Sequence, residues 1–177
     1  MKCDSGPTAP AAGRSPLGGR TNIVCFGNLY GGDDGVAIHA LRQLQERSLP
    51  EQVGLFEAGT GGIGALVYLD GCDRAILVDA LQTGAPPGSI LELAAADIPA
   101  PEAALTSHMI GVEHIVTLLS LAFPDGAPEV VVVGVEVEAI KLFSDQLSPA
   151  VAAALPALVA RLESMVTACD FGDEPLR

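Results

Sequence analysis

The chain has 177 residues and a formal net charge of −13, which comes from 22 acidic and 9 basic residues. This length suits one domain with a buried core, and the hydrophobic residues, 49% of the total, are spread in short runs typical of a globular protein. The acidic balance argues against nucleic acid as a partner, because nucleic-acid binding needs a basic face. The short apolar runs predict no membrane span.

The first twenty residues are rich in Gly, Pro, Ser and Ala, and they lack the apolar centre of a signal peptide. We expect residues 1–20 to be a flexible tail, 21–170 to form the folded domain, and 171–177 to be a second tail. The four cysteines are scattered without a C-x-x-C pair. A cytoplasmic protein with reduced thiols is therefore expected.

Strand-like and helix-like patterns alternate along the domain. The predicted strands are 21–27, 52–58, 74–79, 89–93 and 129–137, and the predicted helices are 34–48, a short one ending near 69, 108–122 and 149–169. Segment 89–93 is expected to run antiparallel to strand 74–79, across a Pro- and Gly-rich turn. The alternation predicts an α/β fold: a single domain with a mostly parallel twisted sheet of about five strands and helices on both faces.

Ligands of such sheets bind beyond the carboxyl ends of the strands, so polar residues at those positions are the candidates for chemistry. Asp33 and Asp34 follow the first strand. Asp33 is expected to cap the helix that it opens. Asp34 adds like-charge repulsion that a helix dipole offsets by only about 0.3–1 kcal/mol, whereas a bound cation would offset it better. A solvated helix start remains the alternative for Asp34.

Two further candidates lie in other loops. Asp79 ends an apolar strand, where a carboxylate is poorly solvated unless something pairs with it; the alternative is an acceptor for the amides of a neighbouring loop. His108 lies at a predicted helix start, where the dipole keeps imidazole neutral and able to bind a metal, although a lone histidine is often structural. His39 is expected to be exposed. Asp34, Asp79 and His108 together could form an open site for zinc, nickel or manganese.

Another pattern favours a different function. The segment Gly59–Gly64 matches G-x-G-x-x-G, follows a strand and has Asp79 about 20 residues further on, as in a dinucleotide fingerprint. Against this alternative, Glu57 would place negative charge beside a pyrophosphate. The match also leaves Asp34 and His108 without a role. A metal-binding interaction module without catalysis is a third hypothesis.

The motifs jointly resemble the hydrogenase maturation endopeptidases, over about residues 23–162 and in the same order. The matching segments are Gly27-Asn28-x4-Asp33-Asp34-Gly35, Asp73-Arg74-x-Ile76-Leu77-Val78-Asp79-Ala80, Pro86-Pro87-Gly88, Ser107-His108-x-x-Gly111 and Val132-Val133-Gly134-x-x-x-Glu138. The chain departs from the family pattern at Glu57, where an aspartate is common, and at Val137, where a proline is usual. The role of Glu57 is therefore open.

This resemblance implies a nickel-dependent endopeptidase of the aspartic type. Its substrate would be the precursor of a [NiFe]-hydrogenase large subunit, from which it would remove the C-terminal propeptide after nickel insertion. By motif position, Asp34, Asp79 and His108 would contact the metal. The nickel would be carried by the substrate, and zinc or cadmium could take its place.

Overall fold

The described part of the chain alternates between strands and helices, as the sequence predicts. The computed structural model describes residues 19–98, 112–138, 140 and 143–167, so nearly all of the two predicted tails lies outside it. The elements are β1 (Thr21–Phe26), η1 (Asp33–Gly35), α1 (Val36–Gln45), β2 (Val53–Gly59), η2 (Gly62–Tyr68), β3 (Arg74–Leu81), β4 (Ile90–Ala94), η3 (Ala95–Asp97), α2 (Val112–Ala122), β5 (Glu129–Glu136) and α3 (Pro149–Thr167), where η marks a 3-10 helix.

The strands form one five-stranded sheet in the order β2-β1-β3-β5-β4. The first four strands in this order are mutually parallel and β4 is antiparallel, which confirms the predicted α/β class. Strand β4 runs antiparallel to β3, as expected, but its hydrogen-bonded neighbour is β5, which lies between the two. The side chains of β5 are mostly buried whereas those of β4 are half-buried or exposed, so β4 suits the edge and β5 the interior.

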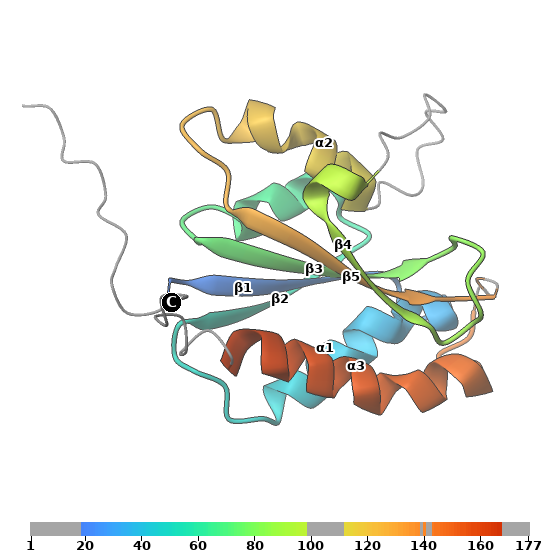
Figure 1. Ribbon diagram of the computed structural model, residues 1–177. Helices are drawn as coiled ribbons and strands as arrows, with labels where there is room; N and C mark the ends of the chain where they lie inside the picture. The colour runs from blue at the N-terminus through green and yellow to red at the C-terminus, as the bar shows by residue number, and fades with distance from the viewer. Residues whose placement is uncertain (1–18, 99–111, 139, 141–142, 168–177) are drawn as a thin grey trace, which may run out of the picture.

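The strand order creates a switch point beside β1. The chain continues from β1 to β2 on one side of it, while β3 lies on the other side. Connections therefore leave the carboxyl ends of β1 and β3 in different directions, and the region between these ends, called the crevice below, is where sheets of this type bind ligands. This edge of the sheet faces right in Figure 1.

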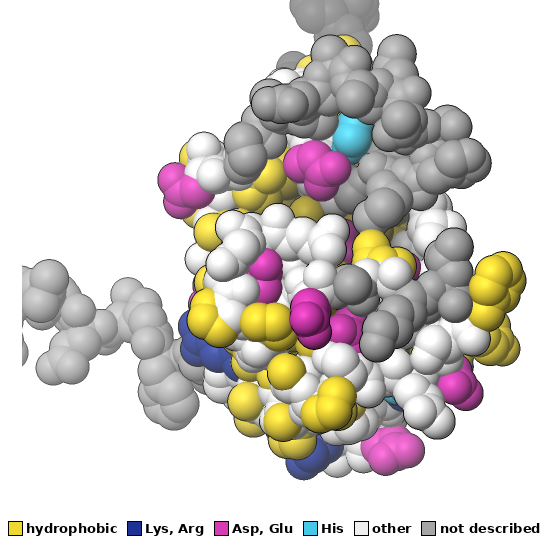
Figure 2. Space-filling model, turned by 90° about the vertical axis from the view of Figure 1, so that its right-hand side faces the viewer, with side chains coloured by type: hydrophobic (Ala, Val, Ile, Leu, Met, Phe, Trp, Pro, Cys, Tyr) yellow, Lys and Arg dark blue, Asp and Glu magenta, His cyan; other side chains and the backbone are white. Residues whose placement is uncertain are grey.

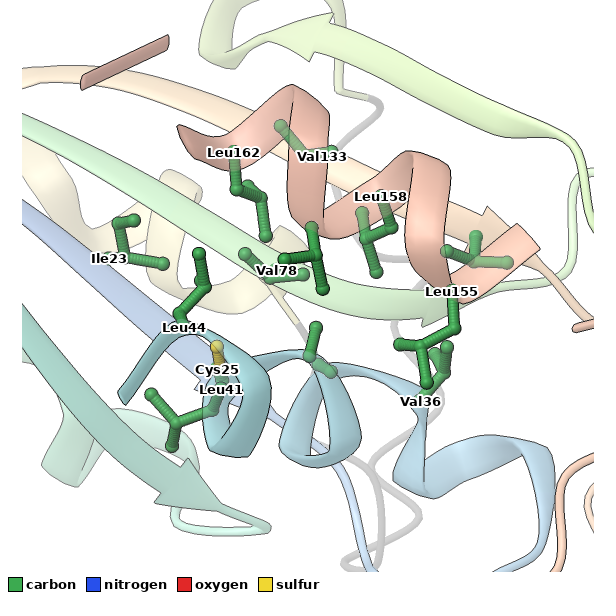
Figure 3. Packing of buried hydrophobic residues seen from close by; sticks show 14 of the residues in the cluster. Ile23, Cys25, Val36, Leu41, Leu44, Val78, Val133, Leu155, Leu158 and Leu162 are labelled. Atoms are coloured by element: carbon green, nitrogen blue, oxygen red, sulfur yellow. The ribbon is translucent and has the colours of Figure 1, made fainter. Parts of the chain in front are cut away.

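Helices cover both faces of the sheet (Figure 1): α1 and α3 lie on one face, and α2 and η2 on the other. On the first face, Leu155, Leu158 and Leu162 of α3 point toward the sheet and α1 (Figure 3). The side of α1 that the sequence predicts to be apolar is buried: Val36, Ala37, Ala40, Leu41 and Leu44. Because α1 and α3 share one core, the start of α3 is fixed relative to the loop that opens α1.

The short apolar runs of the sequence predict no membrane span. By length and composition alone, however, α3 could cross a membrane. In the fold it is a core helix: Leu158, Val159 and Leu162 are at most 1% exposed. A buried helix of a globular protein passes the same test of apolar length, so this is weak evidence for a membrane span.

Glu136, at the end of β5, is a buried carboxylate that the sequence did not single out. It accepts hydrogen bonds from the backbone and hydroxyl of Thr83, at 2.9 and 2.8 Å, and from the Gly84 amide at 2.8 Å. Burial raises its pKa, but hydrogen bonds from Thr83, Gly84 and Ala85 outweigh that effect and hold the pKa below its usual value. Glu136 thus fixes the β3–β4 loop at the same edge as the crevice.

We predict that Glu136→Ala lowers the free energy of unfolding by about 2–3 kcal/mol, because it removes a buried, charged acceptor of the hydrogen bonds from Thr83 and Gly84. Glu136→Gln keeps one acceptor oxygen and should lose less. Urea denaturation at neutral pH measures both. An alanine variant as stable as the parent would show that water replaces the carboxylate at no cost.

Candidate active site

Asp34 lies in η1, just beyond β1, and its carboxylate is held by the loop that carries it. The Asn28 amide donates to Asp34 Oδ2 at 2.8 Å. Two glycines leave room for this arrangement. Gly27 has a φ of +117°, and a Cβ there would lie 1.9 Å from the Asp34 carbonyl oxygen. A Cβ at Gly31 would lie 2.8 Å from the Cβ of Asp34. The glycines of this loop thus allow close packing around an acidic side chain.

Asp79 lies on β3, next to β1, and is partly buried. The Ala80 amide donates to Asp79 Oδ1 at 2.8 Å. The backbone of Val112, the first residue of α2, also donates to this carboxyl group. Asp79 therefore joins the end of a central strand to the start of the helix that covers that face.

Asp34 and Asp79 are close enough to interact electrostatically. Burial, then the negative charges of Asp34 and Glu113, raise the pKa of Asp79 to about 7 against the hydrogen bonds from Ala80 and Val112. Burial also raises the pKa of Asp34, against the hydrogen bond from Asn28. Among the described residues, neither aspartate forms an ion pair with a lysine or arginine. The crevice therefore holds two acidic groups whose ionised forms lack a compensating cation.

Asp33 has a different role from the one predicted. Gly32, not Asp33, is the N-cap of η1, and no side chain caps it. The buried Asp33 carboxylate instead accepts a 2.6 Å hydrogen bond from the amide of Ser148, immediately before α3. The prediction of a local cap was wrong because a distant backbone donor, brought in by the packing of α3 on α1, occupies the carboxylate.

His108 lies outside the described residues, so its position relative to the two aspartates is a matter for proposal. In the part of the chain that the structure describes, no three His, Cys, Asp or Glu side chains gather as a metal site. His39 is half-buried, contrary to the prediction that it is exposed, and its Nε2 has no hydrogen-bond partner among the described residues. Its place on α1, beside the buried face, explains this burial.

Glu57 and Cys25 are register neighbours on β2 and β1, so their side chains lie on the same face of the sheet. Cys25 belongs to the core under α1 and α3, whereas Asp79 contacts α2 on the opposite face. Burial, Asp79 and Glu57 raise the pKa of the Cys25 thiol far above its usual value. The thiol is therefore neutral and is not a nucleophile. Glu57 is exposed and points away from the carboxyl group of Asp79.

The face at the carboxyl ends of the strands is acidic. Figure 2 shows Asp and Glu side chains grouped in the middle of this face, while the Lys and Arg side chains in view lie near its margin. Such a distribution favours a cationic ligand over an anionic one. Paired carboxylates at the switch point of a parallel sheet thus define an α/β protein with an acidic site.

Comparisons with known proteins agree with this class. The model of the hydrogenase maturation protease family HycI matches residues 38–165, a range that begins just after the Asp34 loop. Hydrogenase expression/formation protein HoxM of Azotobacter vinelandii is 31% identical over 146 residues, covering 80% of this chain and 70% of HoxM. Hydrogenase expression/formation protein HupD of Bradyrhizobium diazoefficiens is 26% identical over 105 residues, covering 58% of this chain and 55% of HupD.

Solved structures share the fold. The hydrogenase maturating endopeptidase HybD from Escherichia coli superposes with a TM-score of 0.70 at 22% identity, covering 84% of this chain and 93% of HybD. A hydrogenase 2 maturation peptidase from a Thaumarchaeota archaeon gives 0.63 at 25% identity, covering 84% and 98%. The chain belongs to the hydrogenase maturation protease family, and by that membership it is a hydrolase.

The same findings give no support to the dinucleotide-binding alternative. The segment Gly59–Gly64 does not open an α-helix, since it leads into η2, a 3-10 helix of 7 residues. A turn of this kind provides only a short and poorly aligned helix dipole for a pyrophosphate.

The raised pKa of Asp79 predicts how stability depends on pH in the metal-free protein. The folded state binds a proton that the unfolded chain releases near pH 4, so the stabilisation is complete below pH 4 and is lost as the pH rises through about 7. We predict that Asp79→Asn removes this loss, which amounts to at most about 1.4 kcal/mol per pH unit. Thermal unfolding of both proteins with a chelator, from pH 4 to 8, tests this. Parallel curves would contradict it.

Proposed function

We propose that this protein is a nickel-dependent endopeptidase that removes the C-terminal propeptide from the precursor of a [NiFe]-hydrogenase large subunit after the metal has been inserted. The observation that supports this proposal best is the pair Asp34 and Asp79, two partly buried carboxylates that interact without a compensating cation among the described residues. A divalent ion would remove their repulsion. The acid-lined crevice lies where ligands of parallel sheets bind.

The metal is part of the substrate in this proposal. A nickel ion held by thiolates of the client would retain open positions, and Asp34 and Asp79 would fill them. The Asn28 amide binds one oxygen of Asp34, and the backbones of Ala80 and Val112 donate to the carboxyl group of Asp79, so these donors fix the orientation of both groups. Only a metal-loaded precursor would supply the missing positive charge, so the ion acts as the recognition element.

His108 would be the third ligand. Val112 donates to Asp79, and His108 is four residues before it in the chain. Four residues span at most about 14 Å, a length that would allow His108 to reach the neighbourhood of Asp79. A neutral imidazole beside two carboxylates would complete a mixed nitrogen and oxygen donor set.

The chemistry is hydrolysis of a peptide bond next to the ion. The substrate's nickel would polarise the scissile carbonyl or position a water molecule, and a carboxylate of the site would accept the proton of that water. We propose that the reaction takes place in the cytoplasm, where the client would be trimmed before assembly.

The test is processing of nickel-loaded precursor, followed by mass spectrometry of the released peptide. Asp34→Asn, Asp79→Asn and His108→Ala should each lower the initial rate by about 100-fold or more, since each removes a ligand or proton acceptor. Asp125→Asn removes an exposed charge before β5, away from the crevice, and should process normally. Nickel-free precursor should remain uncut. Full cleavage of the precursor by all three site variants would contradict the proposal.

A further inference from the structure

Two aromatic side chains stand exposed on the segments around Asp34. The side chain of Tyr30, in the loop between β1 and η1, is 66% exposed, and that of Phe143, shortly before α3, is 97% exposed. Large aromatic rings are usually at least half-buried, because each can remove 150–250 Å² of surface from water. Two exposed aromatic rings near a candidate active site therefore suggest a surface that contacts a partner.

The backbone holds the two aromatic positions together. The Ser144 amide donates to the Tyr30 carbonyl at 3.1 Å, and the Gly32 amide donates to the Ser144 carbonyl at 2.7 Å. These bonds form a short bridge between Gly31 and Ser144, although the two segments are far apart in the sequence. The exposed rings therefore belong to one fixed surface and not to two independent loops.

Phe143 adopts a backbone conformation that is unfavourable for its side chain. Its φ is +64°, which makes it the non-glycine residue with positive φ in the described part of the chain. A bulky residue in this region costs on the order of 1–3 kcal/mol, and at 97% exposure its ring gains almost no burial in return. Folding alone therefore gives no reason for phenylalanine here, whereas display of the ring to a partner does.

The same surface is connected to the candidate site. The Tyr30 amide donates to Asn28 Oδ1 at 3.0 Å, and the Asn28 amide donates to Asp34 Oδ2 at 2.8 Å. On the other side, the Ser148 amide binds Asp33, so the segment that begins at Phe143 is attached to the Asp33–Asp34 turn. A molecule that rests on the two rings would thus be positioned relative to the Asp34 carboxylate.

We propose that Tyr30 and Phe143 form a docking surface, the aromatic rim, for the body of the protein substrate whose chain end reaches Asp34. This inference rests on the proposed function. Both rings are largely exposed to solvent, so they suit the apolar side chains of a protein surface. Glu138 and Asp145, near Phe143 in the chain, are both exposed acids, and with Lys141 the sequence of residues 138–145 has a formal net charge of −1. The matching client surface therefore has an apolar centre with basic groups around it, and an anionic membrane would be repelled.

The test is the double variant Tyr30→Ser with Phe143→Gly, compared with the parent chain on nickel-loaded large-subunit precursor. Glycine adopts the φ of +64° freely, so the fold should be kept or stabilised. The bonds of the Tyr30 backbone remain in place. We expect KM for the precursor to rise by about tenfold or more, as for loss of an aromatic anchor, with kcat unchanged at saturation.

Leu121→Ser is the matched control. Leu121 is 77% exposed and lies nine positions after Val112, the residue at the Asp79 end of α2, which is about 14 Å along the helix axis. Its KM should equal that of the parent. A double variant with an unchanged KM, or with only kcat reduced, would overturn the inference. The inference would also be overturned if the parent chain formed a concentration-dependent dimer and the double variant did not. In that case a second copy of the chain, and not the substrate, would bind the aromatic rim. If the parent cuts no nickel-loaded precursor, the proposed function itself fails.

Discussion

The repulsion between Asp34 and Asp79 is the interaction on which the other features of this structure depend. The two residues lie in the crevice beside β1; burial raises the pKa of both, and the charge of Asp34 further raises the pKa of Asp79. A protein selected for stability alone would place an arginine or lysine beside them, or replace one of them. Among the described residues, no lysine or arginine forms an ion pair with Asp34 or Asp79. The repulsion is instead relieved when a carboxyl group takes up a proton, and binding of a cation would relieve it as well.

The surroundings of the pair form one connected assembly. Gly27 allows the chain to turn tightly at the end of β1, and its amide binds the Gly59 carbonyl at the end of β2 at 3.0 Å. Asp33 joins the turn to the start of α3, and Asp79 joins β3 to the start of α2. Both helices pack on the sheet core, so helix packing and site geometry are coupled. A ligand that orders the crevice would therefore also affect the first residues of α2 and the segment just before α3.

Local patterns were sufficient to predict the strands and most helices, but they ended the third strand at Asp79, whereas pairing with β5 extends β3 to Leu81. They were insufficient wherever a residue acts on a distant partner. The amide that occupies Asp33 comes from Ser148, 115 residues away, so no N-cap preference could reveal it. Likewise, the insertion of β5 between β3 and β4 depends on burial of both faces of β5, which the hairpin-like turn before β4 conceals. The left-handed backbone of Phe143 has no sequence signal, since such positions usually carry glycine.

The raised pKa of Asp79 affects how the proposed substrate protein could be selected. With a pKa near 7, Asp79 is partly protonated at neutral pH in the metal-free protein, so binding of a divalent ion releases a proton and is weakened by it. In the proposed function, two carboxylates that compete with protons would hold a free ion poorly, but they would suffice for an ion that arrives already bound to a protein that also contacts the aromatic rim. Weak metal binding and wide protein contact then act together: neither an unloaded precursor nor a free ion would form the full set of interactions.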